Sequence, residues 1–236
     1  MNITKYNDTY FKHKLYDSSI RKVINTLIGH YRIQKKYPDL QEIYEIKKNK
    51  YEGAILSPYE EYISVVSSEI MAASLELSIF CILMCDMIKP QRILDLGSGF
   101  SSYVFRSLPS IIGNDYKPTI CSVDDSMEWL DKTKTFLTAH DIPSNNLVIW
   151  NDFVQQQLDP FDLILYDLGG FEFRKENLKQ IIKLCDKKGT IIFDDMHSAE
   201  YGRYLNKILK DNNYTNFDIS YYTKDKFGRY SHLATF

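Results

Sequence analysis

Short apolar runs alternate with longer amphipathic segments from Gln91 to the end of the chain. Each run has the length of one strand, and the segments between them are long enough for a helix that crosses back over a sheet. Strands that alternate with helices form right-handed βαβ units, which build a parallel sheet covered by helices on both faces. The expected strands are residues 92–96, 119–123, 147–150, 161–166 and 189–193.

The end of the chain follows a different pattern. Residues 217–222 and 230–236 are two further strand-like runs, and the segment between them contains Gly228. Such a pair predicts an antiparallel hairpin. The expected fold class is therefore α/β, with a doubly wound, mostly parallel, Rossmann-like sheet that ends in an antiparallel C-terminal hairpin.

The first 90 residues are expected to be helical. The spacing of apolar residues predicts one amphipathic helix over residues 20–31. Ser57, Pro58 and Glu60 have the order of a helix start, with an N-cap, a proline at the first helical position and a capping-box acid. The apolar face behind them predicts a helix to Met84 with a break near residues 67–68. We therefore expect a helical extension or lid at residues 1–90 and an α/β domain at residues 91–236.

Composition excludes several classes of protein. Lys and Arg number 29 against 31 Asp and Glu, a net charge of −2, whereas nucleic-acid binders usually carry a basic excess. No nucleic-acid partner is expected, although the charge does not exclude RNA. No apolar run approaches the roughly 20 residues of a membrane span, and the N-terminus lacks a signal-peptide pattern, so we expect a cytoplasmic protein without a membrane partner. Cys81 and Cys85 lie among apolar residues and are expected to be buried.

A glycine-rich turn follows the first expected strand, with Gly97, Ser98 and Gly99 in sequence. Glycines allow a ligand to approach the backbone closely, and the next helix offers its N-terminus. The second expected strand ends at Asp124, whose carboxylate can accept two hydrogen bonds from a ribose diol. This combination predicts a nucleotide-like ligand, either S-adenosylmethionine (SAM) or NAD.

Three details favour SAM over NAD. Asp95 occupies a position that is usually apolar in the dinucleotide fingerprint, and Ser102 replaces its third glycine. The motif also lies between a helical segment and the antiparallel hairpin. In these features the sequence from about residue 91 onward resembles the class I SAM-dependent methyltransferases, and this resemblance implies a seven-stranded sheet and SAM as cofactor. A Rossmann-like domain that binds no cofactor remains an alternative.

The resemblance implies roles for particular residues. Asp95 through Gly99 match the first motif of the family, an acid and an apolar residue followed by Gly-x-Gly. Asp124 matches the ribose-binding acid. Asp152, followed by Phe153, matches the adenine-side acid after the third strand.

The loop after the fourth expected strand begins at Asp167 and lacks the Asn/Asp-Pro-Pro-aromatic sequence usual in enzymes that methylate base amines. An adenine or cytosine N-methyltransferase is therefore disfavoured. The fifth expected strand ends at Asp194 and Asp195. Because the fourth and fifth strands are neighbours in this fold, we expect the three acids to converge at the edge of the sheet where ligands bind.

Three carboxylates that lie close together need a compensating cation or protons, and oxygen ligands of this kind suit Mg²⁺. The arrangement resembles metal-dependent O-methyltransferases of the catechol, caffeoyl-CoA and macrolide-sugar types. This resemblance implies that Asp167, Asp194 and Asp195 bind a metal that orients an acceptor hydroxyl and lowers its pKa. The catechol type has a lysine base where this chain has Gly170, so His197 is the predicted base.

The sequence thus predicts a SAM-dependent methyltransferase acting on the hydroxyl of a small-molecule acceptor, with Mg²⁺ as a candidate ion and with Asp167 and His197 as candidate catalytic residues. Two alternatives remain: a metal-independent methyltransferase acting on a protein or nitrogen acceptor, and a SAM-binding protein without turnover. At the acid pair, the alternative is that one acid caps the helix near residue 199. The N-terminal segment is a candidate acceptor wall, through Tyr51, Tyr59 and Tyr62, or a homodimer interface.

Overall fold

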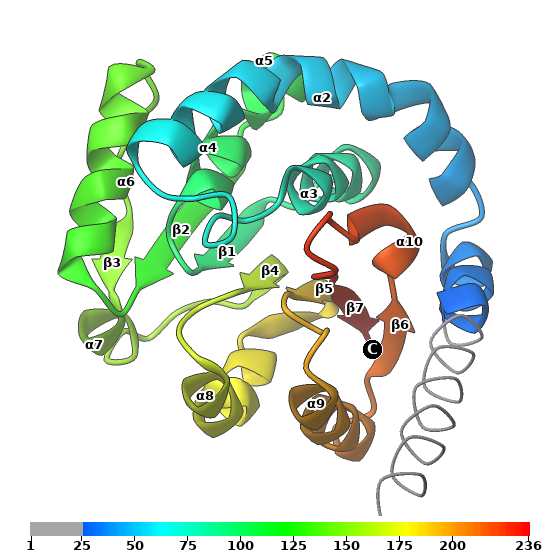
Figure 1. Ribbon diagram of the computed structural model, residues 1–236. Helices are drawn as coiled ribbons and strands as arrows, with labels where there is room; N and C mark the ends of the chain where they lie inside the picture. Colours follow the sequence, from blue (N-terminus) through cyan, green and yellow to red (C-terminus); the bar gives the residue numbers. More distant parts are fainter. Residues whose placement is uncertain (1–25) are drawn as a thin grey trace, which may run out of the picture.

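A seven-stranded sheet lies between two layers of helices in the computed structural model, which describes residues 26–236 (Figure 1). The strand order is β3-β2-β1-β4-β5-β7-β6. The first five strands are parallel, and β7 runs antiparallel to both β5 and β6. This topology confirms the fold class expected from the sequence. The strands are β1 (Arg92–Leu96), β2 (Thr119–Asp124), β3 (Leu147–Ile149), β4 (Phe161–Tyr166), β5 (Cys185–Phe193), β6 (Thr215–Asp218) and β7 (His232–Thr235).

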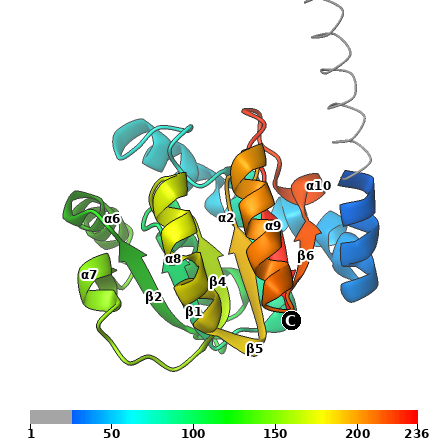
Figure 2. The same cartoon turned by 90° about the horizontal axis from the view of Figure 1, so that it is seen from below.

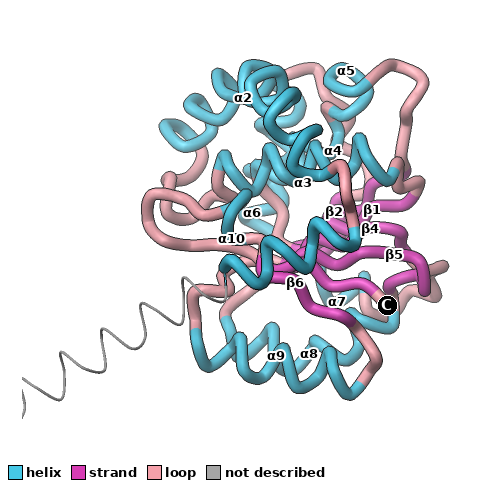
Figure 3. Tube along the Cα trace, turned by 90° about the vertical axis from the view of Figure 1, so that its right-hand side faces the viewer, coloured by secondary structure: helices cyan, strands magenta, loops and turns pink. Residues whose placement is uncertain are grey.

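Two hydrophobic cores flank the sheet, and Figure 3 shows the strands as a layer between the helices. One core is covered by α2 to α6 and α10, and the other by α7, α8 and α9. Figure 2 shows α8 and α9 lying side by side across the second face. The helices are α2 (Leu40–Val65), α3 (Leu75–Ile88), α4 (Phe100–Arg106), α5 (Leu108–Ile112), α6 (Met127–Ala139), α7 (Trp150–Phe153), α8 (Phe171–Lys183), α9 (Ala199–Asp211) and α10 (Ser220–Thr223).

The central strands supply both cores in alternation. On β1, Ile93 faces the first core and Leu94 faces the second, and on β4 the same holds for Leu163 and Ile164. Successive side chains of a strand point to opposite faces, so a parallel strand covered on both sides must be apolar at nearly every position. This is why the central strands were recognisable as continuous apolar runs.

The predicted helix start at Ser57 is wrong. Helix α2 passes through this position without interruption, with Pro58 inside it. Proline removes one backbone hydrogen bond from a helix interior. Ile55 and Tyr59, on either side of the proline, are both buried in the first core, and we attribute the continuity of the helix to this packing.

The predicted break near residues 67–68 is confirmed, because α2 ends at Val65 and α3 begins at Leu75. Ser74 caps α3, since its Oγ accepts a hydrogen bond from the backbone N–H of Leu77 at 3.1 Å. Arg229, from the loop before β7, donates to three backbone carbonyls of the segment between the helices, those of residues 69, 70 and 72. This segment is therefore fastened to the C-terminal hairpin.

The C-terminal hairpin is confirmed, but its first strand is shorter than expected. Strand β6 ends at Asp218, and the next residues form α10 instead of continuing the strand. The Asp218 carboxylate accepts a hydrogen bond from the N–H of Ser220 at 2.9 Å and so starts the turn. The turn brings Tyr222 into the first core against Tyr44 and Phe80, with ring centroids 5.0 and 5.5 Å away.

The N-terminal helices share a core with the sheet. Residues of α2 and α3 pack in the same cluster as Ile93 and Leu163, and Cys81 and Cys85 of α3 are buried, as expected. Of the helix expected at residues 20–31, the part from residue 26 onward is helical and the rest lies outside the described residues. The division of the chain at residue 90 stays a prediction. Among the described residues, no helix combines the length and apolar character needed to cross a membrane.

Candidate active site

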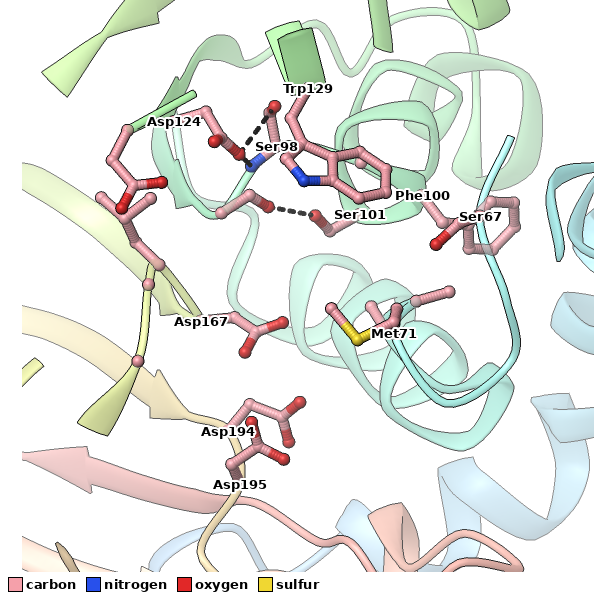
Figure 4. Close-up of a pocket in the computed structure, with 18 of the residues that line it drawn as sticks. Ser67, Met71, Ser98, Phe100, Ser101, Asp124, Trp129, Asp167, Asp194 and Asp195 are labelled. Carbon is pink, nitrogen blue, oxygen red and sulfur yellow. Dashed lines mark hydrogen bonds between the residues drawn. The ribbon is translucent and has the colours of Figure 1, made fainter. Parts of the chain in front are cut away.

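A pocket of about 380 Å³ opens at the carboxyl ends of the central strands (Figure 4). Its lining comes from the turn after β1, the end of β2 and the loops after β4 and β5, together with residues of the segment before α3. The chain passes from β1 to β2 on one side and places β4 on the other, so the pocket lies where the strand order reverses. Open α/β sheets bind their ligands at this switch point.

Asp95 lies beneath the turn rather than in the pocket. Its side chain is fully buried, and its two carboxylate oxygens accept hydrogen bonds from the hydroxyls of Ser101, Ser102 and Ser122 at 2.5–2.7 Å. These bonds join the start of α4 to β2. The structure thus places Asp95 as a support of the glycine-rich turn, and its predicted cofactor contact would be indirect.

Gly97, Ser98 and Gly99 all line the pocket. The backbone of Gly97 has a φ of +104°, and a Cβ at this position would lie 2.8 Å from the carbonyl oxygen of Asp167. A Cβ on Gly99 would lie 2.9 Å from the hydroxyl of Tyr62. The positive φ and the close backbone of Asp167 therefore require glycine at position 97, whereas at position 99 the nearest atom is the end of the Tyr62 side chain.

Asp124 joins the turn to the end of β2. Its Oδ2 accepts hydrogen bonds from the backbone N–H and the hydroxyl of Ser98, at 2.8 and 3.0 Å, and its Oδ1 accepts one from the N–H of Ser126 (Figure 4). Burial raises the pKa of Asp124 to about 6, although the hydrogen bonds from Ser126 and Ser98 oppose this change. A half-protonated carboxyl near pH 6 gives the pocket a measurable signature.

We expect the affinity for S-adenosylhomocysteine (SAH) to fall as the pH is lowered through about 6. The raised pKa means that Asp124 becomes neutral below this pH, and a neutral carboxyl is a weaker acceptor for a ribose diol than a carboxylate. Calorimetric titration should show binding roughly three- to tenfold weaker at pH 5 than at pH 8. The SAH affinity of the Asp124→Asn variant should not change with pH over the same range. An equal change of affinity with pH in both proteins would contradict the role of Asp124 in binding the ribose.

Asp152 and Phe153 do not line the pocket. Asp152 is exposed on α7, and Phe153 is buried in the second core beside Trp150. Two residues that the sequence analysis missed are present instead: Asp125, directly after β2, and Trp129, in the first turn of α6. Both residues closely follow Asp124 in the sequence, and this proximity is the feature that could have identified them as pocket residues. Figure 4 shows the Trp129 indole beside Ser98.

The three acids expected to converge do so. Asp167, Asp194 and Asp195 each offer a carboxylate oxygen, and these oxygens lie within 4.8 Å of one another. Figure 4 shows the three side chains following one another along the pocket. Asp194 also accepts a hydrogen bond from the Ser231 hydroxyl at 2.7 Å. Burial raises the pKa of Asp167 and of Asp194, and repulsion from the neighbouring carboxylates raises both further, with Asp194 and Asp195 acting on Asp167 and with Asp195 acting on Asp194.

A buried arginine, missed in the sequence analysis, already compensates this charge. Arg174 of α8 is only 5% exposed, and its Nη2 donates to Asp167 Oδ1 at 2.7 Å and to Asp195 Oδ2 at 3.3 Å. Oxygen ligands of this kind are chemically suited to Mg²⁺. Arg174 nevertheless bonds one oxygen of Asp167 and one oxygen of Asp195 and places its positive charge beside the acids, so in this arrangement the residues do not fit a divalent ion.

His197 lies outside the pocket that contains the acids. Its ring Nδ1 is 3.5 Å from Asp195 Oδ1, but its side chain is 44% exposed and lines a separate cavity of about 830 Å³. The helix after the acids is capped by Ser198, whose Oγ accepts from the N–H of Tyr201, so neither acid acts as its cap. The assignment of His197 as the base remains a prediction.

The three candidate tyrosines of the acceptor wall have different positions. Tyr62 lines the pocket next to Gly99. Tyr51 is buried and donates a hydrogen bond to Asp86, and Tyr59 packs on the ring of Phe100 at 5.1 Å. Tyr51 and Tyr59 thus belong to the core beneath the pocket wall.

No protein-family model matches the sequence, and the search of curated proteins finds no match. Solved structures do match. The SAH-bound methyltransferase PaMTH1 of Podospora anserina aligns with a TM-score of 0.60 at 15% identity, over 78% of this chain and 87% of that one. An O-methyltransferase of Bacillus cereus in complex with SAH aligns with a TM-score of 0.56 at 15% identity, over 75% of this chain and 89% of that one.

A third match is the O-methyltransferase TomG of Streptomyces achromogenes, which is involved in tomaymycin synthesis and was solved with SAM. It aligns with a TM-score of 0.53 at 13% identity, over 70% of this chain and 80% of the other. At identities this low, the structural matches establish a shared architecture and nothing more. Together with the strand order, the matches show that the chain has the fold of the class I SAM-dependent methyltransferases.

Proposed function

We propose that the protein is a SAM-dependent methyltransferase that transfers a methyl group to a hydroxyl of a small molecule. The observation that carries the proposal is the position of Asp124 at the switch point of the sheet, bonded to Ser98 of the glycine-rich turn and facing the pocket. A carboxylate at the end of β2 is placed to accept the two hydroxyls of a ribose. Trp129 next to it offers an aromatic face toward the same space.

The other end of the pocket is suited to an acceptor. Ile70 and Met71, from the segment between α2 and α3, contribute apolar side chains to the lining, and Figure 4 shows Met71 across from Asp167. A pocket of this size accommodates ligands of small-molecule dimensions, and apolar walls with a few convergent polar groups are typical of such sites. The combination favours a compact, partly apolar acceptor over a protein surface.

The chemistry requires orientation and removal of one proton. Bound SAM would supply a methyl group already activated by its sulfonium. The pocket walls would then hold the acceptor oxygen in line with the methyl carbon, which is the main contribution a protein can make to such a transfer. In this proposal Asp167 replaces His197 as the base, because Asp167 lines the pocket and His197 does not. The Mg²⁺ assistance expected from the sequence is not part of this proposal, because Arg174 bonds the carboxylates.

The test is transfer of a radiolabelled methyl group from SAM to a panel of acceptors: phenols, catechols and aliphatic alcohols, with amines, an unfolded protein and RNA as competing classes. We expect label in a hydroxyl compound, and no transfer by the Asp124→Ala variant. Label only in amines or protein would instead support the metal-independent alternative. SAH binding without transfer to any class would support a SAM-binding protein without turnover. The same assays with EDTA test the predicted role of Mg²⁺, and homodimer formation and the absence of a nucleic-acid partner stay predictions.

A further inference from the structure

We propose that Arg174 is the resident cation of the acidic cluster and takes the place that a divalent metal would occupy between Asp167, Asp194 and Asp195. The inference does not rest on the proposed function. Its structural content concerns the charges of the cluster itself. It predicts that the intact protein binds no divalent ion at these carboxylates.

The guanidinium contacts both loops that carry the acids. Besides the bonds to Asp167 Oδ1 and Asp195 Oδ2, its Nη2 donates to the backbone carbonyl of Asp167 at 3.0 Å. Its Nη1 donates to the carbonyl of Asp194 at 3.3 Å, and its Nε donates to the carbonyl of Gly169 at 3.0 Å. Arg174 thus bonds to all three acids, through side chain or backbone, and uses each of its three nitrogens.

Burial strengthens the pairing of Arg174 with Asp167 and Asp195 and makes the guanidinium difficult to replace by a metal ion. Arg174 is 5% exposed, and the side chains of Asp167 and Asp195 are 21% and 23% exposed. Arginine is the cation best suited to such a position, because its planar group stays charged, is weakly hydrated and matches carboxylate geometry. Charges this poorly exposed to solvent attract each other more strongly than surface pairs do. A metal ion would have to displace the guanidinium and leave it buried without its partners, which is unfavourable.

The backbone at Asp195 supports the same conclusion. Asp195 has a φ of +59°, a conformation that non-glycine residues seldom adopt. This backbone conformation costs of order 1 kcal/mol and persists only where the surroundings hold it. The bond from Arg174 to Asp195 Oδ2 is one of the contacts that hold this side chain over the pocket. Arg174 therefore acts as a positioning residue for the acid cluster as well as its counter-ion.

The experiment is titration of Mn²⁺, followed by electron paramagnetic resonance of the free ion, with no SAM or acceptor present. Wild-type protein should show no site tighter than about 1 mM. Arg174→Gln frees the carboxylates and should create a site at least about tenfold tighter, and Arg174→Gln combined with Asp194→Asn should lose it again. Arg92→Gln is the matched control, because Arg92 pairs with Asp159 outside the pocket and its loss should create no site.

A micromolar Mn²⁺ site in the wild-type protein that disappears in Asp194→Asn would overturn the proposal, and so would a folded Arg174→Gln variant that gains no affinity. The wild-type measurement needs no variant at position 174, so a tight wild-type site would overturn the proposal even where Arg174→Gln does not fold, and Arg174→Lys then tests the role of the charge. Arg174→Lys, which keeps the charge but lacks the planar guanidinium, should like the wild type show no Mn²⁺ site tighter than about 1 mM. Because these readouts are independent of turnover, loss of the proposed methyl transfer would leave them unchanged.

Discussion

Asp124→Ala is expected to weaken SAH binding by at least about 100-fold. Hydrogen bonds to a charged acceptor contribute about 1.5–3 kcal/mol each, and a ribose diol would make two of them. A loss of about 2.8 kcal/mol corresponds to a factor of about 100 in affinity. The variant also removes the acceptor of the backbone N–H of Ser98, which donates to Asp124 at 2.8 Å. Loss of this hydrogen bond should loosen the turn beneath the cofactor. Isothermal titration calorimetry at pH 8 measures the effect.

Asp152→Ala is the matched control for this variant. The sequence resemblance assigns Asp152 to the adenine side, but the structure places it exposed on α7 and outside the pocket lining. Its replacement should change SAH affinity by less than about twofold, because surface substitutions have small effects. Asp124→Asn keeps a hydrogen-bond acceptor for Ser98, so its SAH affinity should lie between those of Asp124→Ala and Asp152→Ala. Tight SAH binding by a folded Asp124→Ala protein would remove the ribose assignment, and weak binding by Asp152→Ala would restore the role expected from the sequence.

Gly97→Ala is expected to lower the free energy of unfolding by about 3 kcal/mol, through backbone strain and overpacking together. Gly97 has a φ of +104°, and the added Cβ would lie 2.8 Å from the carbonyl oxygen of Asp167 and 2.9 Å from its carbonyl carbon. Both atoms belong to the backbone directly after β4, where the N–H of Asp167 donates to the carbonyl of Leu96, so neither can move away without disturbing the sheet. Thermal unfolding should show a midpoint lower by roughly 6–12 °C for a domain of this size.

Gly53→Ala should have the opposite effect. Gly53 lies inside α2, and a Cβ there would meet nothing within 4 Å. Alanine is more favourable than glycine in a helix interior by about 1 kcal/mol, so the variant should be slightly more stable than the wild type. Equal midpoints for the two variants would show that the turn at Gly97 relaxes, and that the approach to β4 is less constrained than the structure indicates.

The central strands could be anticipated from sequence because burial on both faces leaves a clear signal. Strands β1 and β4 are apolar at most positions, and the acid that directly follows β4, Asp167, indicates a function at the carboxyl edge. Helix boundaries were less certain. The local sequence at Ser57 and Pro58 has the features of a helix start. The burial of Ile55 and Tyr59 in the same core outweighs this local preference and keeps α2 continuous.

The candidate site was anticipated in part. Asp124 and the glycines follow strand ends, so their meeting at the sheet edge depends only on topology. Trp129 and Arg174 lie on helices, and no motif indicates which face of a helix turns toward a pocket. Asp152 and His197 follow strand ends as well, yet α7 leaves Asp152 exposed and the loop after β5 turns His197 toward the second cavity.

The sequence by itself determined the fold class, the glycine-rich turn and the convergence of three acids, because these follow from apolar periodicity and from strands that end at a common edge. The tertiary structure alone decided the charge balance of the site. Arg174 reaches the acids from α8 by packing its side chain between two loops, a contact that depends on the helix position and not on local sequence. Whether three carboxylates require a metal or already have a cation is therefore determined by packing in three dimensions.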